Sequence, residues 1–301
     1  MHCIESGSQC DRIVNLKEGQ VQSGVTHNGD VQIAYEDFGK PGGRPLLLIS
    51  GLDSQMIGWP DGFCEALAGA AFHVVRYDHR DAGLSTHFAG RKKAYELTDM
   101  IDDMMAVLDA MGWESANLAG LSMGGGLAQF AALLQPERVR TVTAISAIPQ
   151  YGQPIRLFRY IRFPGPFKLV FRRYDDSPED KQRMLMDVTR LTEARSLPLN
   201  DEWVRETAAE SLRRHAPDRY ARSRQLAAGF AAKLPNGGIA RITQPVLVLN
   251  GDQDPIVRPA AGRMLARAVP RGRFLLVHRM GHMFSAPLWP ELVSEIDRHA
   301  T

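Results

Sequence analysis

The chain has 301 residues, of which 44% are hydrophobic and 23% are charged, with 36 basic against 34 acidic side chains. A chain of this length and composition can bury a large core, which excludes the disordered and fibrous classes of protein. The net charge of +2 gives no general attraction to nucleic acid or to an anionic membrane. We therefore expect no nucleic-acid partner, and the sequence leaves the oligomeric state open.

The cysteine content argues against cross-links and metal sites. Cys3, Cys10 and Cys64 are an odd number at no regular spacing, so neither a disulfide framework nor a zinc site is expected. No stretch approaches the roughly 18 consecutive apolar residues of a membrane-spanning helix, and residues 1–20 lack the apolar centre of a signal peptide. The sequence thus predicts a cytoplasmic protein that begins with a loose tail over residues 1–20.

The expected elements alternate between strands and helices. Asn28-Gly29 lies between two β-prone stretches and predicts an antiparallel hairpin. Further strands are expected within 44–51, 72–78, 115–122, 138–147, 244–257 and 272–282, and helices over about 60–70, 98–111, 123–135 and 259–269. Thr98 is expected to cap the second of these helices, and a final helix is expected to leave His299 exposed. This alternation predicts an α/β fold, with a mostly parallel sheet covered by helices on both faces.

Residues 149–236 interrupt the alternation. They contain helical patterns, no strong strand pattern and more basic than acidic side chains, which we interpret as a solvated helical surface. Because this segment falls between two expected strands, we predict that it forms a helical cap. The cap would be inserted into a core made of residues 21–148 and 237–301.

One serine lies at the junction of an expected strand and an expected helix. Gly120-Leu121-Ser122-Met123-Gly124 fits the G-x-S-x-G pattern, in which a sharp turn lifts the serine hydroxyl out of the sheet. A turn this tight leaves no room for side chains larger than glycine two residues to either side. A phosphate-binding loop is the alternative, but the stretch lacks the G-K-[ST] ending of that motif. We predict that Ser122 is a nucleophile.

A serine nucleophile needs a base, and the base needs an acid to orient it. Two carboxylates, Asp252 and Asp254, follow the strand within 244–257, and two histidines, His278 and His282, lie near the end of the next strand. Asp252 is expected to close a turn and His278 to belong to the strand. We therefore predict Asp254 as the acid and His282 as the base, in the chain order Ser, Asp, His.

Acyl transfer also needs hydrogen-bond donors for an oxyanion. The backbone amide of Met123, directly after the serine, and that of Leu52, in the loop after the strand within 44–51, are the predicted donors. His79 is expected to hold a loop near the site. Trp59 and Phe284 are candidates for the substrate pocket, although core packing explains both equally well.

Several of these stretches together resemble a known family. GWPDGFCEAL, HVVRYDHRDAGLST, GLSMGG, GDQDPI and MGH occur in this order, over about residues 25–146 and from 242 to the end. They resemble the α/β-hydrolases, and within them a bacterial carboxylesterase and lipase branch that includes aclacinomycin methylesterase. Many relatives have His-Gly where this chain has Ser50-Gly51, and many have glycine where it has Asp81.

The resemblance implies an α/β-hydrolase fold and the same site residues. The family's triad falls on Ser122, Asp254 and His282, and its oxyanion amides fall on Leu52 and Met123. The expected activity is hydrolysis of a small-molecule carboxylic ester through an acyl-enzyme, with no cofactor and no metal.

Other activities remain open at this point. A C-C bond hydrolase, a lactonase, a thioesterase or a cofactor-free perhydrolase would use the same triad, whereas epoxide hydrolases and haloalkane dehalogenases need a carboxylate at position 122. A ligand-binding protein without activity is a less favoured alternative. The sequence does not specify the substrate.

Overall fold

The computed structural model describes residues 21–90, 94–149, 159–162, 174–175, 177–216, 218 and 220–300. The predicted loose tail lies outside these ranges, as does part of the predicted cap.

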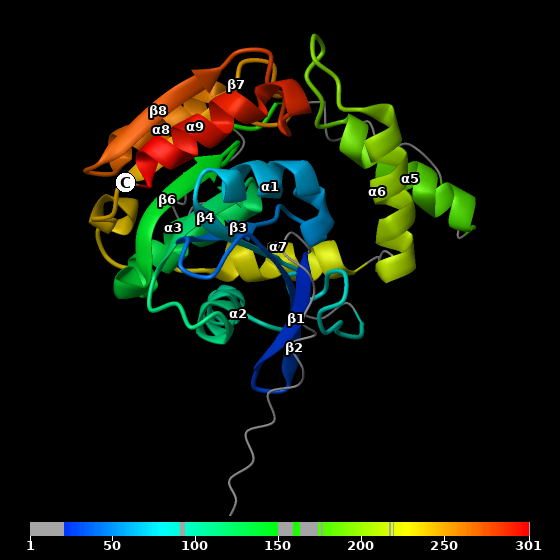
Figure 1. Ribbon diagram of the computed structural model, residues 1–301, viewed down its shortest axis with the longest axis horizontal. Coiled ribbons are helices and arrows are strands. Elements are labelled where there is room, and N and C mark those ends of the chain that lie inside the picture. Colours follow the sequence, from blue (N-terminus) through cyan, green and yellow to red (C-terminus); the bar gives the residue numbers. More distant parts are fainter. Residues whose placement is uncertain are drawn as a thin grey trace, which may run out of the picture.

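An eight-stranded sheet forms the centre of the protein (Figure 1). Its strand order is β1-β2-β4-β3-β5-β6-β7-β8, and every pair from β4 to β8 is parallel, whereas β2 is antiparallel to both of its neighbours. The strands are β1 (Gln22–Asn28), β2 (Val31–Phe38), β3 (Arg44–Ile49), β4 (Phe72–Tyr77), β5 (Ala116–Leu121), β6 (Val139–Ile145), β7 (Val246–Gly251) and β8 (Gly272–Val277). The predicted α/β fold with a mostly parallel sheet is confirmed.

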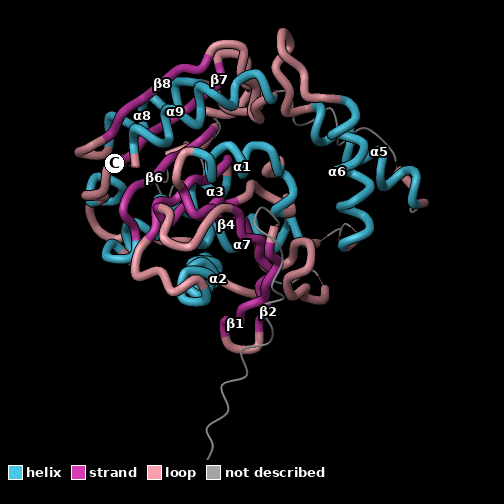
Figure 2. The backbone as a smooth tube through the Cα atoms, in the orientation of Figure 1, coloured by secondary structure: helices cyan, strands magenta, loops and turns pink. Residues whose placement is uncertain are grey.

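Helices cover both faces of this sheet (Figure 2). One apolar cluster joins one face of the sheet to α2 (Leu97–Ala110), α3 (Met123–Leu134) and α8 (Pro259–Ala268), and another joins the opposite face to α1 (Asp61–Gly69) and α9 (Trp289–His299). Alternate residues of β3 enter the two clusters, because successive side chains of a strand point to opposite faces. The inner strands are buried on both faces, which explains their continuous apolar sequences.

Local signals set the ends of several elements. Gly29, with φ of +59°, forms the hairpin turn between β1 and β2, as predicted. The prediction that Thr98 caps α2 is wrong, since Glu96 caps the helix and exchanges capping hydrogen bonds with Asp99. His299 is half-buried rather than exposed, since Nε2 of its ring lies 3.1 Å from both the backbone nitrogen of Leu247 in β7 and the carbonyl oxygen of Val142 in β6.

Three helices of the segment 149–236 are described. They are α5 (Pro178–Arg190), α6 (Asp201–Arg214) and α7 (Ala221–Ala231). In Figure 1, α5 and α6 pack on each other and stand apart from the sheet, beyond the carboxyl ends of its strands. Helix α7 instead lies against the core, where Ala228 joins the apolar cluster of α2 and α3.

Candidate active site

The turn between β5 and α3 has a strained backbone. Ser122 adopts φ of +54° and ψ of −113°, a combination that residues other than glycine rarely occupy. Its N–H donates to the carbonyl oxygen of Ile145 at 2.8 Å, which joins the turn to the end of β6. Because α3 begins at the next residue, the positive end of the helix dipole lies at this serine.

Close backbone contacts explain the glycines on either side. A β-carbon on Gly120 would lie 2.2 Å from the carbonyl group of Gly124, and one on Gly124 would lie 2.1 Å from the carbonyl oxygen of Ile49. Side-chain carbons do not approach other atoms so closely. The prediction that this turn admits only glycine at these two positions is confirmed.

The structure brings Asp254 and His282 together. Nδ1 of His282 lies 2.9 Å from Oδ2 of Asp254, and both side chains are buried. The other carboxylate oxygen, Oδ1, accepts hydrogen bonds from the N–H groups of Ile256 and Val257 at 2.7 and 2.8 Å. The carboxylate is therefore fixed at both oxygens, and the ring nitrogen left for proton exchange is Nε2 of His282.

Asp252 and His278 form a second pair of the same kind at the surface. Nδ1 of His278 lies 3.1 Å from Oδ2 of Asp252, but the side chain of His278 is 84% exposed. Oδ1 of Asp252 accepts from the N–H of Arg279 at 2.8 Å, so this aspartate joins the loop after β7 to the turn after β8. His278 follows the last residue of β8 rather than lying within the strand.

The loop after β3 packs against the serine turn. A β-carbon on Gly51 would lie 3.6 Å from Cβ of Ser122, so the next residue, Leu52, lies close to the serine. Among the described residues, the N–H groups of Leu52 and Met123 make no hydrogen bond. Nε2 of the buried His79 lies 3.0 Å from the carbonyl oxygen of Ser50, so this histidine holds the start of the loop.

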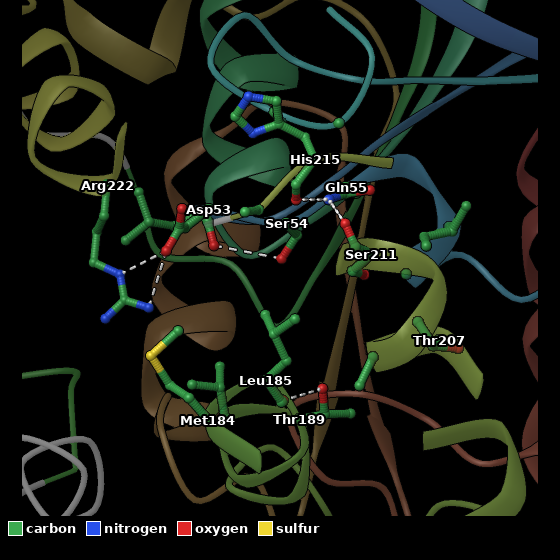
Figure 3. A pocket seen from close by; sticks show the side chains of 18 of the residues that line it. Asp53, Ser54, Gln55, Met184, Leu185, Thr189, Thr207, Ser211, His215 and Arg222 are labelled. Atoms are coloured by element: carbon green, nitrogen blue, oxygen red, sulfur yellow. Dashed lines mark hydrogen bonds and ion pairs between the residues drawn. The ribbon is translucent and has the colours of Figure 1, made fainter. Parts of the chain in front are cut away.

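A cavity of about 140 Å³ lies between this loop and the helices α5, α6 and α7 (Figure 3). Leu185 and Thr189 of α5 line it together with Thr207 and Ser211 of α6, and polar residues of the loop form another wall. Leu52 and Met283 also line the cavity, so it adjoins both the proposed oxyanion loop and the neighbour of His282.

Trp59 and Phe284 lie in the core instead. They are 2% and 3% exposed, and both pack against the ring of Phe63. Neither residue lines the cavity of Figure 3. Their place in the apolar cluster matches the core-packing explanation that the sequence left open.

Two arginines of the segment 149–236 reach the loop that follows β4. Arg214, at the end of α6, lies 2.5 Å from a carboxylate oxygen of Asp78, and Arg224 of α7 lies 2.7 Å from one of Asp81. All four side chains are buried. These two ion pairs bind α6 and α7 to the core beside the cavity.

No motif in the sequence points to Gln225, whose side chain accepts a hydrogen bond from the backbone N–H of Asp53 in the loop after β3. The available signal was the spacing of Arg222 and Gln225, which places two polar side chains on one face of α7. That spacing alone does not reveal what the face contacts.

Neither a metal site nor a membrane-spanning helix is found in the described part of the chain. No group of three or more His, Cys, Asp or Glu side chains there is arranged to hold a metal ion. No described helix has both the length and the apolar character needed to cross a membrane.

Comparisons with known proteins agree with this architecture. The family model described as alpha/beta hydrolase fold matches residues 44–286. Two curated relatives are rhodomycin D methylesterases, one from Streptomyces sp. (strain C5) and one from Streptomyces peucetius. They are 27% and 29% identical to this chain, and the alignments cover 90% of this chain and 95% and 96% of the respective relatives. The crystal structure of the esterase RhEst1 from Rhodococcus sp. ECU1013 superposes with a TM-score of 0.72 at 22% identity, covering 93% of this chain and 98% of that one.

The family match spans most of the chain, and the sheet, the glycine-flanked serine turn and the buried Asp-His pair follow in the order that this architecture requires. The chain therefore belongs to the α/β-hydrolase fold family.

Proposed function

We propose that this protein hydrolyses a carboxylic ester through a covalent acyl-enzyme on Ser122. The observation that carries the proposal is the buried Asp254–His282 pair, held at 2.9 Å at the sheet edge where the strained serine turn also lies. Both loops follow parallel strands of one sheet, and the carboxyl ends of such strands share an edge.

The reaction begins with proton transfer. Nε2 of His282 takes the proton of the Ser122 hydroxyl as its oxygen attacks the ester carbonyl, and the carbonyl oxygen becomes an oxyanion. The N–H groups of Leu52 and Met123 donate hydrogen bonds to that oxyanion, and each such donor is worth about 3 kcal/mol in the transition state. The C–O bond then breaks, and His282 returns the proton to the leaving alcohol.

The second half of the reaction, hydrolysis of the acyl-enzyme, repeats these steps with water in place of the serine hydroxyl. His282 deprotonates a water molecule, which attacks the acyl-enzyme; the acid product leaves and Ser122 regains its proton. Asp254 stays ionised throughout and stabilises the imidazolium that forms twice in each cycle. These steps use side chains and backbone amides of the chain alone.

A methyl ester of a larger acid is the proposed substrate class. Support comes from the two curated relatives, both named as methylesterases, which align with this chain over nine-tenths of its length. The apolar side chains along α5 and α6 offer a surface for the acyl part, beside Leu52 and Met283.

Replacement of the nucleophile tests the mechanism. We expect Ser122→Ala to lower kcat on p-nitrophenyl esters and on methyl esters by a factor of about 10⁴ or more, because the hydroxyl that forms the acyl-enzyme is absent. Circular dichroism and the unfolding midpoint would establish that the variant is folded.

Covalent labelling gives an independent readout. A fluorophosphonate probe is expected to modify Ser122 in the native protein and to leave the alanine variant unmodified. Ester turnover that survives in the purified variant, or a native protein that forms no adduct at Ser122, would contradict the proposed function.

A further inference from the structure

The turn that contains Leu52 is held by a helix of the segment 149–236. Asp53, the next residue, has φ of +58°, in the left-handed region that non-glycine residues rarely adopt. Its N–H donates to Oε1 of Gln225 on α7, at 2.8 Å. A strained turn persists only when its surroundings fix it, and here the fixing group comes from a residue 172 positions away.

The amide of Gln225 is fixed at both ends. Its Nε2 donates to the carbonyl oxygen of Arg80 at 3.3 Å, in the loop after β4, while its Oε1 accepts from Asp53 in the loop after β3. The residue is only 1% exposed, so water does not compete for either hydrogen bond. Gln225 therefore joins two loops at the carboxyl edge of the sheet with a defined orientation of its amide.

A second contact from α7 reaches the same turn from the solvent side. Arg222 lies 3.1 Å from the carboxylate of Asp53, and a dashed line marks this ion pair in Figure 3. The arginine side chain is 52% exposed, and an ion pair in that setting contributes little. The buried hydrogen bond of Gln225 is thus the stronger constraint on the turn.

This constraint acts on the neighbouring peptide group. The Asp53 N–H belongs to the peptide that joins Leu52 to Asp53, so its hydrogen bond to Gln225 fixes the rotation of that peptide. Two adjacent peptide planes share the dihedral angles of the residue between them. Fixing the plane after Leu52 therefore restricts the plane before it, which carries the Leu52 N–H.

We propose that Gln225 is a positioning residue that keeps the Leu52 N–H directed at the oxyanion. This inference rests on the proposed ester hydrolysis, because the oxyanion forms only if that reaction takes place. The positioning role of Gln225 gives α7 a part in the chemistry as well as in covering the cavity. The geometry of the oxyanion hole then depends on a helix outside the predicted core of residues 21–148 and 237–301.

Gln225→Met tests the proposal, because it keeps the length of the side chain and removes both hydrogen bonds. We expect kcat to fall tenfold to a hundredfold, with KM within a factor of about two, since the donor acts on the transition state more than on bound ester. The rate of fluorophosphonate labelling at Ser122 should fall in parallel. Gln225→Glu retains an accepting oxygen for Asp53 and should recover part of the loss.

Hydrogen exchange measures the turn directly. The Asp53 amide should exchange faster in Gln225→Met than in the native protein. Gln244→Met is the matched control, because this buried glutamine donates to Pro136 beside the amino end of β7, at the opposite edge of the sheet. We expect the control to lower stability and leave kcat unchanged.

The outcomes separate the two proposals. If Gln225→Met lowers stability while kcat and the labelling rate stay at native values, the positioning role is wrong and the proposed function stands. The same holds if kcat falls by the same factor in the Gln244 control. If the native protein hydrolyses no ester and forms no adduct at Ser122, the proposed function itself fails and the inference falls with it.

Discussion

At the scale of single residues, burial separates two chemically similar Asp-His pairs. Asp254 with His282 and Asp252 with His278 come from the same two loops and make contacts of 2.9 and 3.1 Å. The first pair is enclosed, and its carboxylate accepts two backbone hydrogen bonds, whereas the histidine of the second points into solvent. The positions of Asp254 and His282 in the loops favoured the first pair. Their burial depends on the tertiary structure, so no local sequence pattern predicts it.

The same chemical change at the two aspartates should have different effects. Asp254→Asn keeps the shape of the side chain but removes the charge that stabilises the imidazolium and fixes the ring tautomer. We expect kcat on a p-nitrophenyl ester to fall by a factor of about 10² to 10⁴, with a small change in KM. Asp252→Asn should stay within a factor of about two of the native kcat. Equal losses in the two variants would contradict the assignment of the acid.

At the scale of elements, the strand-turn-helix unit of β5 and α3 was the most predictable part of the site. Its glycines are required by backbone contacts between residues near in sequence and the adjacent β3, so the motif in the sequence carries the geometry. The predicted helix starts at residue 98, one residue after the true start of α2. The difference arises because Glu96 and Asp99 cap the helix in place of the more common threonine.

The contacts of α7 could not be predicted. Its polar face bonds to loops more than a hundred residues earlier in the chain, and helical periodicity reports which residues share a face, never what that face meets. The fold of the core was therefore predictable from apolar patterns. The contacts between the segment 149–236 and the loops of the core could be known only from the structure.

Two glycine substitutions test the packing of the serine turn. Gly124→Ala introduces a methyl group 2.1 Å from the carbonyl oxygen of Ile49, so β3 and α3 must move apart. We expect the free energy of unfolding to fall by about 1–3 kcal/mol, measured by urea denaturation, and esterase activity to fall with it. Gly229→Ala in α7 is the control: nothing lies within 4 Å of the added carbon, and alanine favours a helix by about 0.5–1 kcal/mol. The proposed packing at these two glycines would be contradicted if Gly229→Ala destabilised the protein. It would also be contradicted if the Gly124→Ala variant were as stable as the native protein.

At the scale of the whole molecule, burial of neutral histidines links stability to pH. Burial lowers the pKa values of His79 and His299 below that of an unfolded histidine. As the pH falls below about 6.5, the unfolded chain binds protons that these two folded side chains do not bind. The folded state therefore loses stability as the pH decreases from 6.5 toward the lowered pKa values, and regains it above 6.5.

His79 offers the clearest measurement of this linkage. His79→Gln removes the titrating group while its side-chain amide can still donate to the carbonyl oxygen of Ser50. We expect the difference in the free energy of unfolding between pH 7.5 and pH 5.5 to be smaller in this variant than in the native protein. An unchanged pH dependence in His79→Gln would refute the account.

The arginines at the ends of two buried ion pairs limit how the segment 149–236 can be exchanged. A donor segment grafted from another hydrolase would have to supply partners for Asp78 and Asp81, which remain in the recipient. Without Arg214 and Arg224, each buried carboxylate would lose its counter-ion, a change that costs about 3–5 kcal/mol per pair. Asp78 also accepts the N–H groups of Met56 and Leu84, so it cannot turn away to solvent without breaking the loops after β3 and β4. Chimeras intended to change substrate range should therefore transfer the loop after β4 together with the helices that it binds.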